Sequence, residues 1–190
     1  MKTFFISLRL FLMLTILTGI LYPLLITGVA KTVFPEKANG SLVFKNNRIV
    51  GSALIGQTFD SAIYFSSRPS ASIYNALSSG GSNYALTNAT LKKLVEERKK
   101  AFIFNNQIDS LSAIPSEMLF ASGSGLDPHI SVESALLQVN RIAKARNFNE
   151  KQKEELVEKV KANTEFPQWR CLGETRINVL LINLEIDKIK

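Results

Sequence analysis

The sequence predicts an α+β soluble domain, residues 31–190, behind a single N-terminal transmembrane helix. The first observation is a long apolar run without charged residues at positions 10–30. The second is a set of later stretches in which apolar residues recur at helical spacing. The third is a pair of short strand-like segments separated by asparagines. Helices and strands that follow one another in this irregular order are typical of α+β domains.

The apolar run at 10–30 predicts a membrane anchor. As a helix it would extend roughly 30 Å, which is the thickness of a bilayer's hydrocarbon core. The alternative is a cleaved secretory signal, with Lys2 and Arg9 as its basic start and a small-residue cleavage site at 28–30. We favour the retained anchor because the run is longer than the usual signal core of about 7–15 residues. Residues 1–9 then form a short N-terminal flank.

Two features inside the run concern its geometry and its neighbours. Pro23 has no N–H to donate to the carbonyl of Gly19, so a local distortion is expected at a point where a membrane helix tolerates one. Thr15 and Gly19 form a pair of small residues four positions apart, which lets a second helix approach closely. Thr15 and Gly19 are therefore predicted partner contacts. A lipid-facing helix with incidental small residues is the alternative.

Patterns behind the run predict the remaining elements. Residues 42–44 and 48–50 are expected to form two strands around an asparagine turn, and residues 66–88 a long loop. Helices are predicted at 90–105, at 131–146 with Ser131 as N-cap, and at 149–162 with Asn149 and Gln152 as a variant capping box. The apolar stretch 177–186 is expected to be a strand covered on both faces.

Composition excludes several classes of function. The chain has 23 basic and 16 acidic side chains, and without Lys2 and Arg9 the soluble part keeps a net charge of +5. These charges are dispersed rather than clustered, so no nucleic-acid partner is expected, and membrane lipid remains a possible minor one. Cys171 and His129 are the only residues of their types, so no intrachain disulfide, no zinc-ligand set and no Cys–His nucleophile pair is expected, and no metal site is predicted. With no phosphate-loop motif either, the chain is predicted not to be an enzyme.

One glycine- and serine-rich segment is a candidate binding site. Ser122, Gly123, Ser124 and Gly125 lead towards the helix that is expected to start at Ser131. Backbone N–H groups and the helix dipole at such a point favour an anionic group such as a phosphate. Two turns beyond Ser131, the amide of Gln138 has the chemistry to bond a polar ligand. An ordinary helix-start turn with capping explains the same pattern.

Five strings of residues occur in a characteristic order behind the apolar run. They are GSALIGQTF at 51–59, YFSSRPSA at 64–71, SGGSN at 79–83, SGSGLDPHIS at 122–131 and GETRINV at 173–179. Together they resemble the C subunit of the high-affinity potassium-transporting ATPase, the Kdp complex. The similarity extends over nearly the whole chain.

The resemblance implies an accessory, non-catalytic subunit with two partners, a channel-like potassium-binding subunit and an ATP-hydrolysing P-type subunit. It implies a catalytic chaperone that raises the ATP affinity of the hydrolysing subunit, with ATP as the cofactor of the complex. By this resemblance Gln138 is the residue that meets nucleotide, and the loops around Arg68 and Asp127 are expected to meet a partner.

The resemblance also implies a single-pass protein of the plasma (inner) membrane with an extracytoplasmic soluble domain. The basic residues that flank the anchor would by themselves mildly favour a cytoplasmic domain, although long domains cross membranes largely regardless of charge. An extracytoplasmic domain cannot touch cytoplasmic ATP. The alternative function is therefore a purely structural brace on the channel-like subunit, without nucleotide contact.

Overall fold

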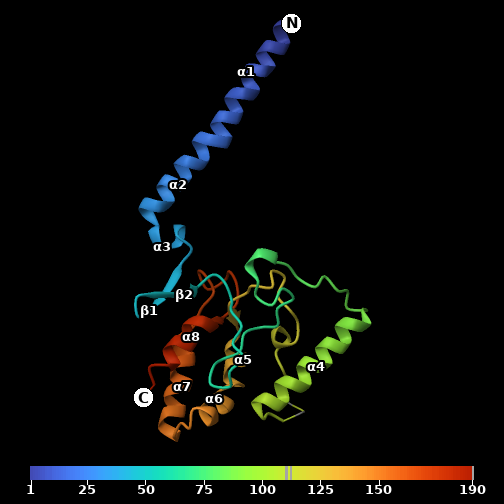
Figure 1. The fold of residues 1–190 in the computed structure, drawn as a ribbon, viewed down its shortest axis with the longest axis vertical. Coiled ribbons are helices and arrows are strands. Elements are labelled where there is room, and N and C mark those ends of the chain that lie inside the picture. Colours follow the sequence, from blue (N-terminus) through green and yellow to red (C-terminus); the bar gives the residue numbers. More distant parts are fainter. Residues whose placement is uncertain (110, 112, 190) are drawn as a thin grey trace. The chain divides into compact units, whose positions relative to one another are not determined.

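The computed structural model describes residues 1–109, 111 and 113–189, and it divides into two units. The first unit comprises Met1–Ser52 and the second comprises Ala53–Lys190. The membrane boundaries at residues 10 and 30 stay a prediction. Figure 1 shows the helices and strands of both units.

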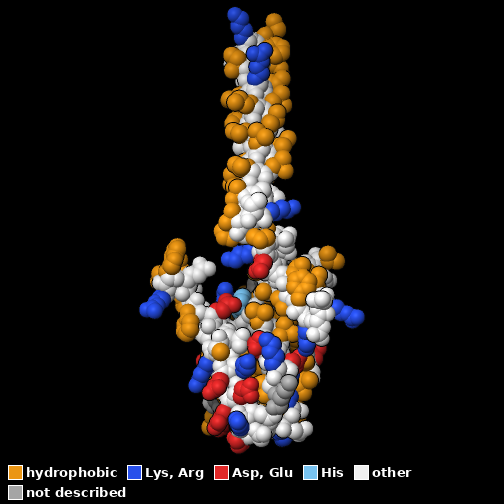
Figure 2. Space-filling view, turned by 90° about the vertical axis from the view of Figure 1, so that its left-hand side faces the viewer, with side chains coloured by type: hydrophobic (Ala, Val, Ile, Leu, Met, Phe, Trp, Pro, Cys, Tyr) orange, Lys and Arg blue, Asp and Glu red, His pale blue; other side chains and the backbone are white. Residues whose placement is uncertain are grey.

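The first unit begins with one continuous helix that is long and apolar enough to cross a membrane, Lys2–Val33. It consists of α1 (Lys2–Ile16), the π-helical turn η1 (Leu17–Leu21) and α2 (Tyr22–Val33). Apolar side chains cover it along its length (Figure 2). The π-helical turn ends two residues before Pro23, where the helix lacks one backbone donor, which agrees with the local distortion expected there.

Threonine hydroxyls inside this helix are satisfied by the helix itself. Thr15 donates to the carbonyl of Phe11 at 2.8 Å, and Thr18 donates to the carbonyl of Leu14 at 2.7 Å. Hydroxyls bonded in this way carry no unpaired donor into an apolar environment. The helix therefore keeps its polar side chains compatible with a bilayer.

A short helix and a hairpin complete the first unit. The helix α3 (Pro35–Ala38) is followed by the antiparallel strands β1 (Leu42–Lys45) and β2 (Arg48–Ser52). The turn residues Asn46 and Asn47 have φ angles of 52° and 60°, a left-handed conformation that asparagine tolerates well. The predicted strand pair with its asparagine turn is confirmed.

The second unit combines helices with a small sheet, which confirms the α+β fold class (Figure 1). The antiparallel sheet has the order β3-β5-β4. Its strands are β3 (His129–Ile130), β4 (Thr164–Glu165) and β5 (Arg176–Asn178). The helical elements are η2 (Ala76–Ser78), α4 (Ala89–Asn106), η3 (Ser116–Met118), α5 (Val132–Leu136), α6 (Val139–Ala145), α7 (Glu150–Ala162) and α8 (Val179–Ile186).

Side-chain caps set where the helices begin, as the sequence predicts. Asn149 and Gln152 form the full capping box of α7, with side chain to backbone bonds of 2.9 and 2.8 Å. The Ser131 hydroxyl accepts a bond from the backbone N–H of Ser134 at the start of α5. The predicted starts at Ser131 and Asn149 are thus confirmed, because a cap satisfies donors that have no partner inside the helix.

The predicted single helix at 131–146 is wrong, because it breaks into α5 and α6 at Gln138. In an unbroken α-helix the Gln138 N–H would bond the carbonyl of Ser134. That carbonyl instead accepts from the Gln138 side chain at 3.2 Å, and the Gln138 N–H bonds Ala135 at 3.0 Å. The side chain therefore competes with the backbone and tightens one turn.

The predicted strand at 177–186 is also wrong beyond Asn178. Only Arg176–Asn178 is a strand, and Val179–Ile186 is the helix α8, capped by Asn178, whose side chain accepts from the Leu181 N–H at 3.2 Å. The buried positions of α8 include 179, 182, 183 and 186, which is helical spacing. The asparagine cap and this spacing indicate a helix, but the apolar run at 177–186 favoured a strand in the sequence analysis.

The core of the second unit lies between α5, α6, α7, α8 and the sheet. Its fully enclosed side chains include Phe65, Ile142, Leu156, Ile177 and Ile182. Phe65 comes from an irregular segment, and the buried Asn183 of α8 fixes it by bonding its N–H at 2.8 Å and its carbonyl at 3.0 Å. A side-chain amide thus supplies the backbone partners that a strand would otherwise provide.

Candidate functional site

The two glycine- and serine-rich clusters, residues 77–83 and 122–131, lie against each other. The N–H of Gly80 donates to the carbonyl of Ser124 at 2.8 Å, and the Ser79 hydroxyl donates to the same carbonyl at 3.0 Å. Ser122 and Gly125 are buried, whereas Gly123 and Ser124 are exposed. The clusters therefore pack two loops together, a pairing that spacing along the sequence does not reveal.

Several N–H groups of the second cluster are used within the chain. The N–H of Gly125 donates to the carbonyl of Ser122 at 3.2 Å, and that of Leu126 donates to the hydroxyl of Ser124 at 3.1 Å. Groups engaged in this way do not converge on an open phosphate-sized site. The proposed nucleotide contacts of Ser122, Gly123, Ser124 and Gly125 stay a prediction.

A carboxylate of the chain itself occupies the start of α5. Glu117 accepts bonds from the Ser131 N–H at 2.8 Å and from the Ser134 hydroxyl at 2.6 Å. Burial would raise the pKa of Glu117, but these hydrogen bonds outweigh it and lower the pKa below its usual value. The sequence led us to expect a bound phosphate at the start of α5. The negative charge at this position is that of Glu117.

Gln138 is fully enclosed and bonded through both ends of its amide. Its oxygen accepts from the Ser66 N–H at 2.7 Å and from Arg141 at 2.8 Å, and its nitrogen donates to the carbonyl of Ser134 at 3.2 Å. The exposed fraction of Gln138 is 0%. In this conformation the side chain has no surface to offer a ligand, and its role is to join α5 and α6 to the segment at Ser66.

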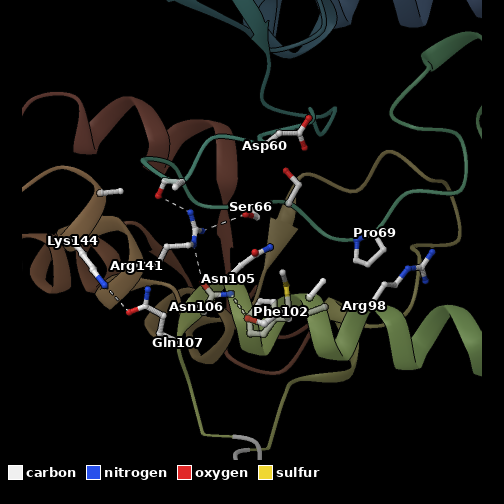
Figure 3. Close-up of a pocket in the computed structure, with 15 residues that line it drawn as sticks. Asp60, Ser66, Pro69, Arg98, Phe102, Asn105, Asn106, Gln107, Arg141 and Lys144 are labelled. Carbon is white, nitrogen blue, oxygen red and sulfur yellow. Dashed lines mark hydrogen bonds between the residues drawn. The ribbon is translucent and has the colours of Figure 1, made fainter.

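Arg141 lies beside Gln138 in this candidate site, and the sequence patterns did not indicate it. It bonds Gln138 at 2.8 Å, and Figure 3 shows its bonds to Asn106 and to the hydroxyl of Ser66. These residues together form a buried polar network. The polar positions 134, 138 and 141 follow one another at spacings of four and three residues. Polar residues at this helical spacing, beside an apolar stripe, could have indicated a buried polar network.

Arg68 and Asp127, the predicted partner contacts in the soluble domain, bind each other. The guanidinium of Arg68 lies 2.6 Å from the Asp127 carboxylate, with 23% and 28% of the two side chains exposed. Asp127 also accepts from the backbone N–H of His129 at 3.0 Å, and the His129 ring lies 3.2 Å from it. A partner role for the two residues stays a prediction, since their main bonds are internal.

Stability should fall in acid because of Asp127. Burial would raise its pKa, but bonds from His129 and the charge of Arg68 outweigh burial and lower the pKa from 3.8 to about 2. A carboxyl whose pKa is depressed on folding stabilises the protein above its ordinary pKa, and that stability is lost as the pH falls from about 4 to about 2. We expect wild type to lose about 2 kcal/mol more than Asp127→Asn over this window in chemical denaturation. Equal losses in both proteins would contradict the assignment.

The predicted contacts in the anchor helix lie in open surroundings. Thr15 and Gly19 are exposed, and a methyl group added at Gly19 would meet nothing within 4 Å. The described residues 1–109, 111 and 113–189 place no group of three or more His, Cys, Asp or Glu where it could hold a metal ion. Acidic and basic side chains are intermixed on the face of the second unit that Figure 2 shows.

These features define a class: a protein with one apolar helix suited to membrane anchoring and an α+β unit stabilised by internal polar networks. The family model of the K+-transporting ATPase c chain, KdpC, matches residues 4–188. The chain belongs to the KdpC family, a subunit family of the potassium-transporting ATPase.

Curated relatives support this membership over nearly the full length. The potassium-transporting ATPase KdpC subunit of Leptospira interrogans is 50% identical over 182 residues, which is 96% of this chain and 92% of that protein. The KdpC subunit of Pectobacterium atrosepticum is 46% identical over 187 residues, or 97% and 95% of the two chains. That of Polynucleobacter asymbioticus is 45% identical over 183 residues, or 95% of each.

Proposed function

We propose that this chain is a non-catalytic accessory subunit that stabilises a potassium-importing ATPase and raises the ATP affinity of its hydrolysing subunit without touching nucleotide. Its partners are the channel-like potassium-binding subunit and the P-type subunit that the family resemblance implies. The effect on ATP is then conformational and passes through the assembly. The soluble unit lies outside the cytoplasm, anchored in the inner membrane by the N-terminal helix.

The enclosure of Gln138 is the observation that carries this proposal. A nucleotide could reach its amide only after the bonds to Ser66 and Arg141 had broken, which would take one acceptor away from a buried guanidinium. The start of α5 is likewise filled by Glu117. The two features that would favour direct nucleotide contact, the Gln138 amide and the start of α5, are thus already occupied within the fold. The rival function, a nucleotide-binding module, requires this network to open.

The side of the membrane on which the soluble unit lies can be measured with a native residue. Cys171 is exposed and is the only cysteine of the chain. We expect a membrane-impermeant maleimide to label it in intact spheroplasts, because an extracytoplasmic unit is open to the reagent. The readout is the mass shift of the purified chain.

Two controls complete the labelling experiment. Cys171→Ser should abolish the signal, and a cytoplasmic cysteine protein should react only after permeabilisation. If Cys171 is protected in spheroplasts and reacts once the membrane is permeabilised, the soluble unit is cytoplasmic and direct nucleotide contact becomes the better function.

Assembly should depend on the small residue at position 19. We expect Gly19→Ile to reduce co-purification of the two larger subunits by about tenfold, because a branched side chain keeps a neighbouring helix at a distance. Where complex still forms, its KM for ATP should rise. Gly28→Ile is the matched control, since Gly28 is equally open but lies nine residues on, about half a turn around the helix. Equal effects of both variants would contradict a specific contact at Gly19.

A further inference from the structure

A cavity of about 730 Å³ opens beside the buried polar network of the second unit (Figure 3). It lies between α4, α6 and the segment at residues 60–69. Phe102 and Met118 supply apolar wall, and Asn105 and Ser66 supply polar groups. This volume, with mixed apolar walls and a few polar groups, is typical of sites for small organic ligands.

The charges that line this cavity are unbalanced. Arg98, Arg141 and Lys144 are the cations, and among the described residues that line it Asp60 alone is acidic. Figure 3 shows Arg141 and Lys144 near each other and Arg98 on the opposite side of the view. Arg98 donates to the carbonyl of Leu119 and Lys144 to the amide oxygen of Gln107, and both acceptors are neutral. The cavity thus carries a net positive charge.

Arg141 is the most unusual of these cations because it is nine-tenths buried without a carboxylate partner in the described part of the chain. Its exposed fraction is 9%. Its acceptors are Asn106 Oδ1 at 2.9 Å, the Ala62 carbonyl at 2.6 Å, Ser66 Oγ at 3.3 Å and Gln138 Oε1 at 2.8 Å. Neutral acceptors satisfy N–H groups but do not neutralise the charge, and a buried charge without a counter-ion is costly.

Burial shifts the pKa of Arg141. It lowers the pKa of the guanidinium from its usual value, and no nearby carboxylate raises it. Arg98 behaves in the same way. A planar guanidinium beside an ammonium group is the arrangement that proteins use to bind carboxylates and phosphates.

We propose that this cavity binds a small oxyanion, a carboxylate or a phosphate, next to Arg141 and Lys144. The anion supplies the counter-charge that Arg141 does not receive from a carboxylate among the described residues, and an organic body would lie along Phe102 and Met118. The site belongs to this chain alone. Its test therefore needs no partner subunit and is independent of the proposed function.

Calorimetric titration of the full chain in detergent micelles tests the site, with sodium glutarate and inorganic phosphate as separate probes at constant ionic strength. We expect one saturable event with at least one probe, and the tighter probe identifies the anion class. Lys144→Gln should weaken it about fivefold, since one charge-assisted contact is lost. Lys100→Gln is the matched control because Lys100 is exposed on α4 and does not line the cavity. It should change the affinity less than twofold.

Two results would overturn the oxyanion site. One is the absence of saturable binding of either probe up to about 20 mM, a limit that corresponds to very weak affinity. The other is an equal loss in Lys144→Gln and Lys100→Gln, which would show a general charge effect. Arg98→Gln replaces Lys144→Gln if circular dichroism shows that the latter is unfolded. Arg141 itself is left intact because its removal would break the network that supports the fold.

Discussion

Replacing Gln138 with leucine should lower the free energy of unfolding by about 4 kcal/mol, because three groups around its enclosed side chain each lose a hydrogen-bond partner at once. The N–H of Ser66 and the guanidinium of Arg141 would lose an acceptor, and the carbonyl of Ser134 would lose a donor. The acceptor that the buried Arg141 guanidinium loses is the largest part of this cost, because hydrogen bonds to charged groups are the stronger ones. Chemical denaturation of the full chain, followed by circular dichroism, measures it.

Two further variants test whether the loss of stability in Gln138→Leu comes from the broken hydrogen-bond network. Gln138→Glu should lose less, because a carboxylate still accepts from Ser66 and adds an ion pair with Arg141. Gln168→Leu, at an exposed glutamine, should stay within about 0.5 kcal/mol of wild type. If Gln138→Leu kept its stability while the complex lost ATP affinity, Gln138 would instead be a nucleotide contact, and the proposed indirect mechanism would be wrong.

The second large effect is expected at Gly125, where alanine should cost about 3 kcal/mol. Gly125 has a φ angle of +68°, which residues with a Cβ rarely adopt. An added Cβ would lie 2.5 Å from the Ser72 hydroxyl and 2.8 Å from the carbonyl of Gly80. The two loops would have to separate to make room. Thermal and chemical denaturation of Gly125→Ala measure the loss.

Gly123 provides the matched control for Gly125 two positions earlier. An alanine Cβ at Gly123 would meet nothing within 4 Å, and the position has no positive φ angle. Gly123→Ala should therefore remain within about 0.5 kcal/mol of wild type. A similar loss in both variants would mean that general loop flexibility, and not the close contact of the two clusters, explains the glycines.

Both variants bear on function because they concern residues that the sequence connects with nucleotide. If they destabilise the isolated chain, the glycine- and serine-rich cluster and Gln138 are explained by loop packing and by a buried network. Their link with ATP would then be indirect, through a domain that must be well folded to stabilise its partners. The labelling of Cys171 tests the same conclusion from the side of membrane topology.

The sequence alone determined those features that depend on neighbouring residues. The apolar run, the asparagine turn of the hairpin and the caps at Ser131 and Asn149 follow from local chemistry, and the structure contains the hairpin and both caps. The order of five strings along the chain also identified the family, which the family model matches over residues 4–188. Local rules work here because each partner lies within a few residues in the chain.

Only the tertiary structure decided how the polar residues are used. Glu117 fills the start of α5, Gln138 breaks the helix that the apolar periodicity predicted, and Arg141 is buried beside a cavity. Residues 179–186, which were expected to form a strand, form the helix α8, which Asn178 caps. The physical reason is the same in each case. A buried polar group must find a partner, and partners such as Ser66 for Gln138, Ser131 for Glu117 and Ala53 for Asn178 lie far enough away in sequence that periodicity and spacing do not reveal them.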